Sequence, residues 1–318
     1  MKVLVTGATG FLGAHTVAAL AAAGHEVYAL RRDLSKLSAL EAHPVLADLR
    51  DSVAVARACE GMEAVVHTGA LSAAWGRLED FTAVNVAGTQ HVLEGCVQHG
   101  VKRLVHISSP AVIFDGLDQV NAPDDAPYPI RFSSHYALTK KLAEDAIRAA
   151  PVNAVILRPK AIYGPGDRSL LPRLVAAAKT GRLPQIGDGQ NTVELTYVSD
   201  VVNAILLALE HDTARGLPYT ITGGEPVRLW DAIRTVLTGL GLSSKLPVLP
   251  LRVALPLAKG MEFVAGLTGR EPRLTRYTVE LLARTQTYDT SRAGTELGYM
   301  PKVSLEDGLE RTFAAWRT

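Results

Sequence analysis

The stretch VLVTGATGFLG, residues Val3–Gly13, decides the fold of this 318-residue chain. Its first residues are apolar and mostly β-branched, as in a buried strand, and a helical pattern follows the last glycine. The glycines have the spacing G-x-x-G-x-x-G, which lets the backbone turn tightly and approach a ligand closely. A purely structural turn could also use glycines. However, this turn joins the first strand to the first helix, where the free backbone N–H groups at the helix start are suited to binding a pyrophosphate. The stretch therefore predicts a dinucleotide site at Gly7, Thr9, Gly10, Phe11, Leu12 and Gly13.

Short apolar runs alternate with longer helical patterns through the first half of the chain. The strand candidates are Val3–Val5, Val27–Leu30, Val45–Leu46, Ala64–His67, Leu104–Ile107 and Ala154–Leu157. The helical patterns are Leu12–Ala23, Ser52–Cys59, Leu78–His99 and Ser134–Ala149. Runs that are apolar throughout and separated by helices predict a parallel sheet covered on both faces. The expected fold is α/β, a doubly wound Rossmann sheet.

The pattern becomes irregular after Pro159, and this change suggests a second part of the molecule. We assign residues 1–165 to the dinucleotide-binding domain, with 194–216 returning to it through a helical pattern. Residues 166–193 and 217–318 form the expected substrate-binding part, which is smaller and mostly helical. The chain shows no internal repeat and no low-complexity linker, so the two parts should pack closely.

Charge and cysteine content exclude several classes of partner. The 33 basic and 32 acidic residues give a net charge of +1, which lacks the basic excess typical of nucleic-acid binding. Two cysteines, Cys59 and Cys96, cannot cross-link a chain of this size, so we expect a reducing, cytoplasmic location. The start of the chain resembles a signal peptide only as far as Thr6–Gly7, and no set of metal ligands stands out.

Leu246–Leu267 is the most apolar stretch of the second half. It is interrupted by charged residues and prolines at Pro247, Pro250, Arg252, Pro256, Lys259 and Glu262. A membrane-spanning helix needs about 20 largely uncharged residues, so we do not expect a span. A lid over an apolar substrate, a surface for peripheral membrane contact and an ordinary helical core remain alternatives.

Two arginines follow the second strand candidate. Proteins that prefer NAD usually place an acidic side chain there, which binds the ribose 2′-hydroxyl. Arg31 and Arg32 would instead pair with a 2′-phosphate, so the sequence predicts NADP(H), with NAD as the alternative. In the competing interpretation the two arginines are merely solvated before a loop, and Asp33 is the acidic residue that binds the ribose 2′-hydroxyl.

Two further strand ends complete the predicted cofactor site. Asp48–Leu49 follows the third strand, where a carboxylate can accept from the adenine amino group. Thr68–Ala70, with Gly69 at its centre, follows the fourth, where small residues let the middle of the cofactor pass close to the backbone. Carboxyl ends of parallel strands form the ligand side of such sheets, although ordinary turns use the same residues.

Tyr136 and Lys140 supply candidate chemistry from one helix face. Residues at i and i+4 share a face, and Ser133 or Ser134 could cap this helix. A phenol with a pKa of about 10 is a poor acid or base near neutrality. We expect the nearby ammonium and a positive nicotinamide to lower the pKa of Tyr136, while Lys140 also binds the nicotinamide ribose. Ser109, after the fifth strand, could donate to the substrate oxygen.

Together these motifs resemble the extended short-chain dehydrogenase/reductase superfamily over essentially the whole chain. The resemblance rests on Thr6–Gly13, Asp48–Leu49, Ser108–Ser109, Tyr136–Lys140 and Leu157–Gly166. It implies hydride transfer between nicotinamide C4 and a secondary alcohol or ketone carbon, with Ser109, Tyr136 and Lys140 as the catalytic set. It also implies that Pro159 and Ile162 contact the cofactor. Ser108, one residue away, is the alternative to Ser109.

Three segments indicate a branch within this superfamily. His106–Gly116 and Gly269–Thr275 resemble 3β-hydroxysteroid and sterol-4α-carboxylate 3-dehydrogenases. That branch includes bacterial 2-alkyl-3-oxoalkanoate reductases, to which Ala74–Gly76 is similar. The leading hypothesis is an NADP-linked dehydrogenase or reductase acting at a 3-hydroxy or 3-oxo group of a bulky apolar substrate.

Two other functions remain as alternatives. Nucleotide-sugar epimerases and dehydratases of this superfamily typically carry an arginine that binds substrate phosphate, where this chain has Val193. A non-catalytic NADP redox sensor would not need Tyr136 and Lys140. The resemblance also implies a homodimer formed through helices Leu78–His99 and Ser134–Ala149.

Overall fold

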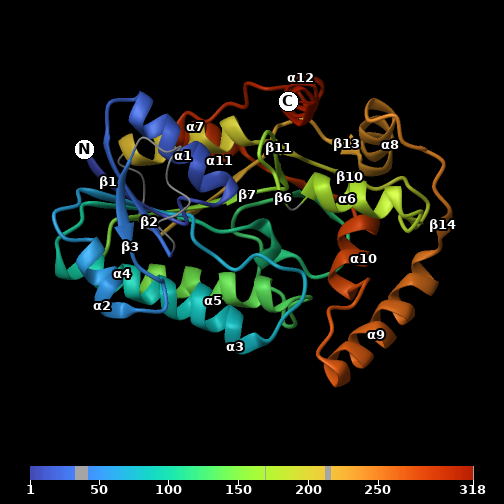
Figure 1. Ribbon diagram of the computed structural model, residues 1–318, viewed down its shortest axis with the longest axis horizontal. Coiled ribbons are helices and arrows are strands. Elements are labelled where there is room, and N and C mark those ends of the chain that lie inside the picture. The colour runs from blue at the N-terminus through green and yellow to red at the C-terminus, as the bar shows by residue number, and fades with distance from the viewer. Residues whose placement is uncertain (33–41, 169, 212–215, 318) are drawn as a thin grey trace.

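A seven-stranded parallel sheet forms the centre of the molecule. The computed structural model describes residues 1–32, 42–168, 170–211 and 216–317. The sheet has the order β12-β7-β5-β4-β1-β2-β3 (Figure 1). Its strands are β1 (Lys2–Thr6), β2 (Glu26–Arg31), β3 (His43–Leu46), β4 (Ala64–His67), β5 (Arg103–Ile107), β7 (Ala154–Pro159) and β12 (Pro218–Ile221). The predicted doubly wound α/β fold is confirmed.

Helices cover both faces of this sheet. One layer contains α2 (Ser52–Ala58), α3 (Leu78–Phe81), α4 (Gly88–Gln98) and α5 (His135–Ala149). The opposite layer contains α1 (Phe11–Ala22), α7 (Val198–Glu210) and α11 (Ser291–Leu297) (Figure 1). Cys59 and Cys96 are buried free thiols in the first layer.

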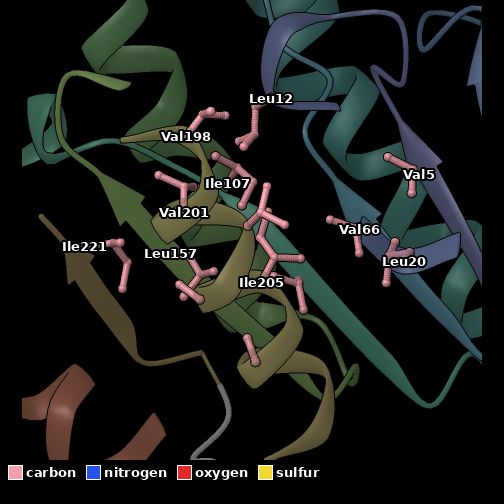
Figure 2. Packing of buried hydrophobic residues seen from close by; sticks show 14 of the residues in the cluster. Val5, Leu12, Leu20, Val66, Ile107, Leu157, Val198, Val201, Ile205 and Ile221 are labelled. Carbon is pink, nitrogen blue, oxygen red and sulfur yellow. The ribbon is translucent and has the colours of Figure 1, made fainter. Parts of the chain in front are cut away.

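The core lies between the sheet and the α1–α7 layer, where Val5, Val66 and Leu157 on the strands meet Val201 and Ile205 on α7 (Figure 2). All five of these side chains are fully buried. Each such side chain contributes about 1.5–3 kcal/mol relative to exposure, so this layer stabilises the sheet that positions the site.

The second part of the chain adds small sheets and further helices. A four-stranded sheet joins β13 (Val227–Arg228), β10 (Thr192–Val193), β15 (Gln286–Tyr288) and β6 (Gln119–Ala122). Two-stranded pairs are β11 (Thr196–Tyr197) with β8 (Ile162–Tyr163), and β14 (Val248–Leu249) with β9 (Gln185–Ile186). The helices are α6 (Leu170–Lys179), α8 (Leu229–Gly239), α9 (Leu251–Thr268), α10 (Arg276–Ala283) and α12 (Leu305–Arg317).

Two details differ from the expected elements. The helix predicted over Leu78–His99 contains a π-helical turn, Thr82–Ala87, between α3 and α4. Asn85 in this turn is buried, and its amide bonds both the N–H and the carbonyl of Leu71. The return to the first domain also extends beyond residue 216, because β12 pairs in parallel with β7.

Candidate active site

The Gly-rich turn forms a cradle that only glycines can build. Gly7 has φ +65°, and a Cβ there would lie 2.7 Å from the Cα of Gly69. A Cβ on Gly13 would lie 2.2 Å from the carbonyl oxygen of Gly7. The missing side chains leave backbone N–H groups at the start of α1 accessible, so these residues fit a dinucleotide pyrophosphate.

A cleft of about 620 Å³ runs over the carboxyl ends of the strands. It is lined by Gly7, Thr9, Gly10, Phe11, Leu12, Gly13, Arg31, Arg32, Asp48, Leu49, Thr68, Gly69, Ala70, Pro159 and Ile162. Ser109 and Tyr136 line the same cleft. The structure therefore brings together every predicted site residue except Lys140, whose side chain lies beneath it.

The arginines and Asp48 gather at the β2 side of the cleft. Arg31 ends β2 and is 3% exposed, whereas Arg32 is exposed. Arg50 binds Asp48 through two nitrogens, at 3.0 and 2.7 Å, and lowers the pKa of that carboxyl to about 2, with Arg32 adding to the effect. Asp48 is thus an ionised acceptor next to Arg32. Asp33, the alternative acid, lies outside the described residues.

Ser109 and Tyr136 face one another at the β5 side of the cleft. Ser109 precedes a 3₁₀ turn and accepts from the Ala111 N–H at 3.2 Å. Tyr136 is in the first turn of α5, which Ser134 caps by accepting from the Ala137 N–H at 3.1 Å. Burial raises the pKa of Tyr136, and its hydrogen bond with Ser109 opposes this effect. A phenol and a hydroxyl placed in this way can hold a carbonyl oxygen and exchange a proton with it.

Lys140 is buried beneath the cleft rather than exposed in it. Its ammonium is 1% exposed, donates to the Ile107 carbonyl at 2.7 Å and lies 3.0 Å from Nε2 of His106. Burial lowers the pKa of Lys140 to about 7, so it carries only part of a charge at neutral pH. In the chain alone, burial of the phenol raises the pKa of Tyr136, so the lowering expected from Lys140 together with a bound nicotinamide stays a prediction.

A histidine pair extends this network beneath the cleft. The rings of His67 and His106 lie 5.1 Å apart, and Nδ1 of His67 lies 2.6 Å from Oγ1 of Thr6. Burial lowers the pKa of His67 to about 3, so it is neutral at physiological pH. Nδ1 of His106 has no hydrogen-bond partner within the described part of the chain. These histidines lie in apolar strand patterns, and we did not predict them as site residues from sequence.

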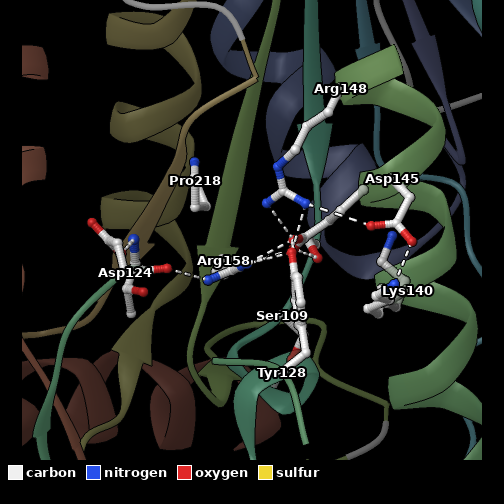
Figure 3. Close-up of polar contacts among 12 residues, drawn as sticks. Ser109, Asp124, Tyr128, Lys140, Asp145, Arg148, Arg158 and Pro218 are labelled. Carbon is white, nitrogen blue, oxygen red and sulfur yellow. Dashed lines mark hydrogen bonds and ion pairs between the residues drawn. The ribbon is translucent and has the colours of Figure 1, made fainter. Parts of the chain in front are cut away.

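A buried ion pair supports the site from behind (Figure 3). Arg158 on β7 binds Glu144 on α5 through Nη2 at 2.6 Å and Nε at 2.8 Å, and both side chains are almost fully buried. Ser108 donates to Glu144 at 2.5 Å, and Tyr128 donates to it at 2.7 Å. Ser108 is therefore engaged in this network, which favours Ser109 as the serine facing Tyr136.

Tyr277 on α10 is a further residue that the sequence analysis missed. Burial raises its pKa, and the next largest effect comes from the neighbouring phenol of Tyr136. Glu280, one turn later, lies against Gly116 in the loop after the 3₁₀ turn. No local sequence signal connects Tyr277 with Tyr136, because the two residues are far apart in the chain.

Replacing Lys140 by Met should remove a pH-dependent destabilisation of the folded protein. The pKa of Lys140 is about 7 in the folded chain and 10.5 ordinarily, so between these values the unfolded chain binds more protons. The free energy of unfolding of the wild type therefore rises with pH in this window. From pH 7 to 9.5 the wild type should gain about 3 kcal/mol relative to Lys140→Met. Urea unfolding of both proteins measures this difference, and parallel pH profiles would contradict it.

Other classes of site are not evident in the structure. The described residues include no cluster of three or more His, Cys, Asp or Glu side chains arranged to bind a metal. Among the helices described, none has both the length and the apolar character needed to cross a membrane. Val193 lies buried in β10, 3% exposed. Its side chain is apolar, so this position offers no cation to a substrate phosphate.

Known proteins with similar sequences and structures agree with this site. A profile of the 3-beta hydroxysteroid dehydrogenase/isomerase family matches residues 4–251. The 2-alkyl-3-oxoalkanoate reductase of Stenotrophomonas maltophilia is 36% identical, with 99% of each chain covered. Human sterol-4-alpha-carboxylate 3-dehydrogenase, decarboxylating, is 33% identical over 98% of this chain and 87% of that protein.

A solved structure with a nucleotide sugar bound has the same fold. MoeE5 in complex with UDP-glucose and NAD has a TM-score of 0.78 and 27% identity, and the match covers 100% of this chain and 99% of that one. The predicted superfamily, the Rossmann fold and the branch are thus confirmed. The chain belongs to the 3-beta hydroxysteroid dehydrogenase/isomerase family and, with it, to the dehydrogenases and reductases of the extended short-chain type.

Proposed function

We propose that this enzyme transfers a hydride between NADP(H) and the 3-hydroxy or 3-oxo group of a bulky apolar substrate of the 3β-hydroxysteroid or long-chain 3-oxo acid type. The observation that carries the proposal is the shared cleft: the Gly-rich cradle, Ser109 and Tyr136 all line it. The strand order β5-β4-β1-β2 puts the arginines on one side of the cradle and the Ser–Tyr pair on the other.

Each residue of the catalytic set has a distinct role in this proposal. The bound nicotinamide supplies or accepts the hydride at the carbonyl carbon. In reduction Tyr136 donates a proton to the carbonyl oxygen, while Ser109 donates a hydrogen bond to it. Lys140 holds the carbonyl end of β5 against α5 from beneath the cleft. The hydrogen bond that the sequence predicts from Lys140 to the nicotinamide ribose would have to reach the cleft from this position. In oxidation the same groups act in reverse, with Tyr136 as the base.

The preference for NADP over NAD is part of the proposal and gives a sharp prediction. Arg32 is exposed beside the cleft, where its guanidinium would pair with a 2′-phosphate. Arg32→Ser should raise the KM for NADPH about 10- to 100-fold, since a charge-assisted hydrogen bond contributes about 1.5–3 kcal/mol, and leave the KM for NADH nearly unchanged. Steady-state kinetics with both cofactors measures this. Arg57→Ser, an exposed arginine on α2 outside the cleft, is the control, and a wild type that prefers NADH would contradict the assignment.

The substrate class rests on two observations. Val193 leaves the site without the arginine that phosphate-bearing sugar substrates would need, and it is buried between β13 and β15. The relatives named for sterol-4-alpha-carboxylate and 2-alkyl-3-oxoalkanoate substrates match almost all of this chain. A bulky apolar substrate therefore fits better than a nucleotide sugar.

Epimerisation or dehydration of a nucleotide sugar is the second candidate, because MoeE5, with UDP-glucose and NAD bound, has the same fold. Consumption of NADPH or reduction of NADP⁺ should be followed with 3-ketosteroids, long-chain 3-oxo acids, their alcohols and UDP-sugars. We expect stoichiometric cofactor turnover with one of the first classes. Conversion of a UDP-sugar without net cofactor turnover would overturn the proposal. A sensor without catalysis is disfavoured, because Tyr136 and Lys140 are both present.

The proposal also covers where the enzyme is located in the cell, how it assembles and how its chain divides into domains. We expect a cytoplasmic enzyme that forms a homodimer through the α3–α4 and α5 layer. Leu142 on α5 and Val97 on α4 are 37% and 50% exposed, which supports an interface there. The substrate-binding part is expected to comprise residues 166–193 and 217–318, with β12 of this part adding an edge strand to the parallel sheet.

A further inference from the structure

His106 is a polar residue at a buried position of β5. It lies between Val105 and Ile107, and its side chain is fully buried. One ring nitrogen, Nδ1, has no hydrogen-bond partner among the residues that the structure describes. A buried polar atom without a partner destabilises a fold, and an apolar side chain would avoid this penalty. Packing alone therefore does not account for a histidine here.

The other nitrogen of this ring contacts Lys140. Nε2 of His106 lies 3.0 Å from Nζ of Lys140, and the same Nζ donates to the Ile107 carbonyl at 2.7 Å. An ammonium has three N–H bonds and no lone pair, so Nε2 is the acceptor when Lys140 is ionised. The proton of the neutral ring is then on Nδ1. Two of the three N–H bonds of Lys140 are thus fixed beneath the cleft.

His67, the neighbouring buried histidine, has both nitrogens engaged elsewhere. Thr89 donates its hydroxyl proton to the Asn85 carbonyl at 2.7 Å, so its oxygen accepts from Nε2 of His67 at 3.0 Å. Nδ1 of His67 then accepts from the hydroxyl of Thr6 at 2.6 Å. The ring packs on that of His106 at an interplanar angle of 43°. His67 therefore supports the His106 ring without binding the ammonium.

We propose that His106 is a positioning residue for Lys140: Nε2 accepts one N–H of the ammonium, the Ile107 carbonyl accepts a second, and the third is left for a hydroxyl of the bound cofactor. The inference rests on the proposed function, which expects a hydrogen bond from Lys140 to the nicotinamide ribose. A charge-assisted hydrogen bond both orients a side chain and favours its ionised form. His106 thus acts through Lys140 and not on the substrate itself.

The titratable groups around Lys140 in the described structure lie on β4, β5 and α5. Burial lowers the pKa of Lys140 to about 7, and Glu144, one helical turn later, opposes this effect. Burial lowers the pKa of His67 to about 3 and that of His106 well below its ordinary value. The pKa of Glu144 is lowered, because its hydrogen bonds outweigh the effect of burial, and that of Tyr136 is raised by burial. Lys140 is thus the group in this set that titrates near neutrality.

The titration of the Lys140 side chain tests this role without substrate or cofactor. In lysine-labelled protein its ¹³Cε resonance is identified by its absence from the spectrum of Lys140→Met, and the wild-type midpoint is expected near pH 7. His106→Phe keeps a ring but offers no acceptor. Its midpoint should fall by about one to two pH units, the effect of losing one hydrogen bond to an ionised group. In His106→Gln the amide oxygen can replace Nε2, so the midpoint should stay within about 0.5 pH unit of the wild type.

His67→Phe is the matched control for this titration. It removes a buried histidine of the same network whose nitrogens contact threonines instead of the ammonium. The protein should become less stable, but the midpoint of Lys140 should stay within about 0.5 pH unit of the wild type, because His67 is neutral. If His106→Phe does not fold, as judged by circular dichroism, His106→Leu removes the same acceptor with a smaller apolar side chain.

Kinetics over a range of pH give a second readout. At pH 7 the ionised fraction of Lys140 should fall from about one half in the wild type to between about one tenth and one hundredth in His106→Phe. The kcat/KM for NADPH should therefore fall about 5- to 50-fold at pH 7. This loss should shrink as the pH falls below 6, because Lys140 regains its proton. His106→Gln should recover kcat/KM to within about threefold of the wild type.

Three results would overturn the proposal. One is a Lys140 midpoint that is unchanged in folded His106→Phe or His106→Leu, and another is a midpoint that falls equally in His67→Phe. The third is a kinetic loss in His106→Phe that is the same at every pH and is not recovered in His106→Gln, which would make the role of His106 purely structural. Absence of turnover by the wild type with every substrate would instead count against the proposed function, and the titration would still decide whether His106 holds Lys140.

Discussion

Replacement of Tyr136 by Phe is expected to lower kcat about 1,000-fold, within the range by which a positioned acid or base accelerates proton transfer. The variant removes only the phenolic oxygen, which faces Ser109 in the cleft. The ring remains in the first turn of α5, so the shape of the cleft should be preserved. Binding of NADPH, followed by its fluorescence, should change less than threefold.

Tyr277→Phe is the matched control for this prediction. It removes the half-buried phenol of Tyr277, whose pKa is affected by Tyr136, but not the proposed proton donor. Its kcat should fall less than tenfold. A Tyr136→Phe enzyme that retains most of its kcat, or a larger loss in Tyr277→Phe, would show that another group moves the proton.

Replacement of Glu144 by Gln is expected to lower the free energy of unfolding by about 3–5 kcal/mol, the cost of breaking a buried ion pair from one side. The change leaves the Arg158 guanidinium, which is 1% exposed, without its carboxylate. It also weakens the hydrogen bonds that Ser108 and Tyr128 donate to Glu144. Urea unfolding of the wild type and the variant at pH 7 measures the difference.

An exposed ion pair provides the control for Glu144. Asp231 and Arg234 on α8 are 3.0 Å apart, with side chains 63% and 39% exposed. Asp231→Asn should cost less than about 1 kcal/mol, as surface pairs do. Equal effects of Glu144→Gln and Asp231→Asn would mean that water reaches the Glu144 site and that the pair does not stabilise the layer behind Ser109.

Local patterns were sufficient to predict six of the seven strands of the parallel sheet and most of the residues that line the cleft. The Gly7–Gly13 turn follows from steric limits on the backbone, and the residues after parallel strands meet at one edge for topological reasons. The small sheet of β13, β10, β15 and β6 could not be predicted in this way. Its strands have two to four residues and come from distant parts of the chain, so no period is visible.

The contacts of the buried polar groups could not be predicted from the sequence either. His106 lies in an apolar strand, and only the fold shows that it meets Lys140 rather than a core side chain. The pKa of Tyr136 depends on how deeply the fold buries the phenol and on its hydrogen bond with Ser109, and periodicity predicts neither. Likewise, the sequence left a lid, a membrane-facing surface and an ordinary helical core as alternatives for Leu246–Leu267, and only the fold shows that Leu257 and Val264 on α9 are exposed.

Transfer of deuterium from the cofactor to the product tests the central claim most directly. NADPH deuterated on the transferred position at C4 should be incubated with a long-chain 3-oxo acid and with a 3-ketosteroid, and the products examined by mass spectrometry and NMR. The account predicts one deuterium at C3 of the alcohol formed from one of these substrates, with one NADP⁺ released per product. Absence of deuterium in both products, together with inversion or dehydration of a UDP-sugar without net cofactor turnover, would contradict it.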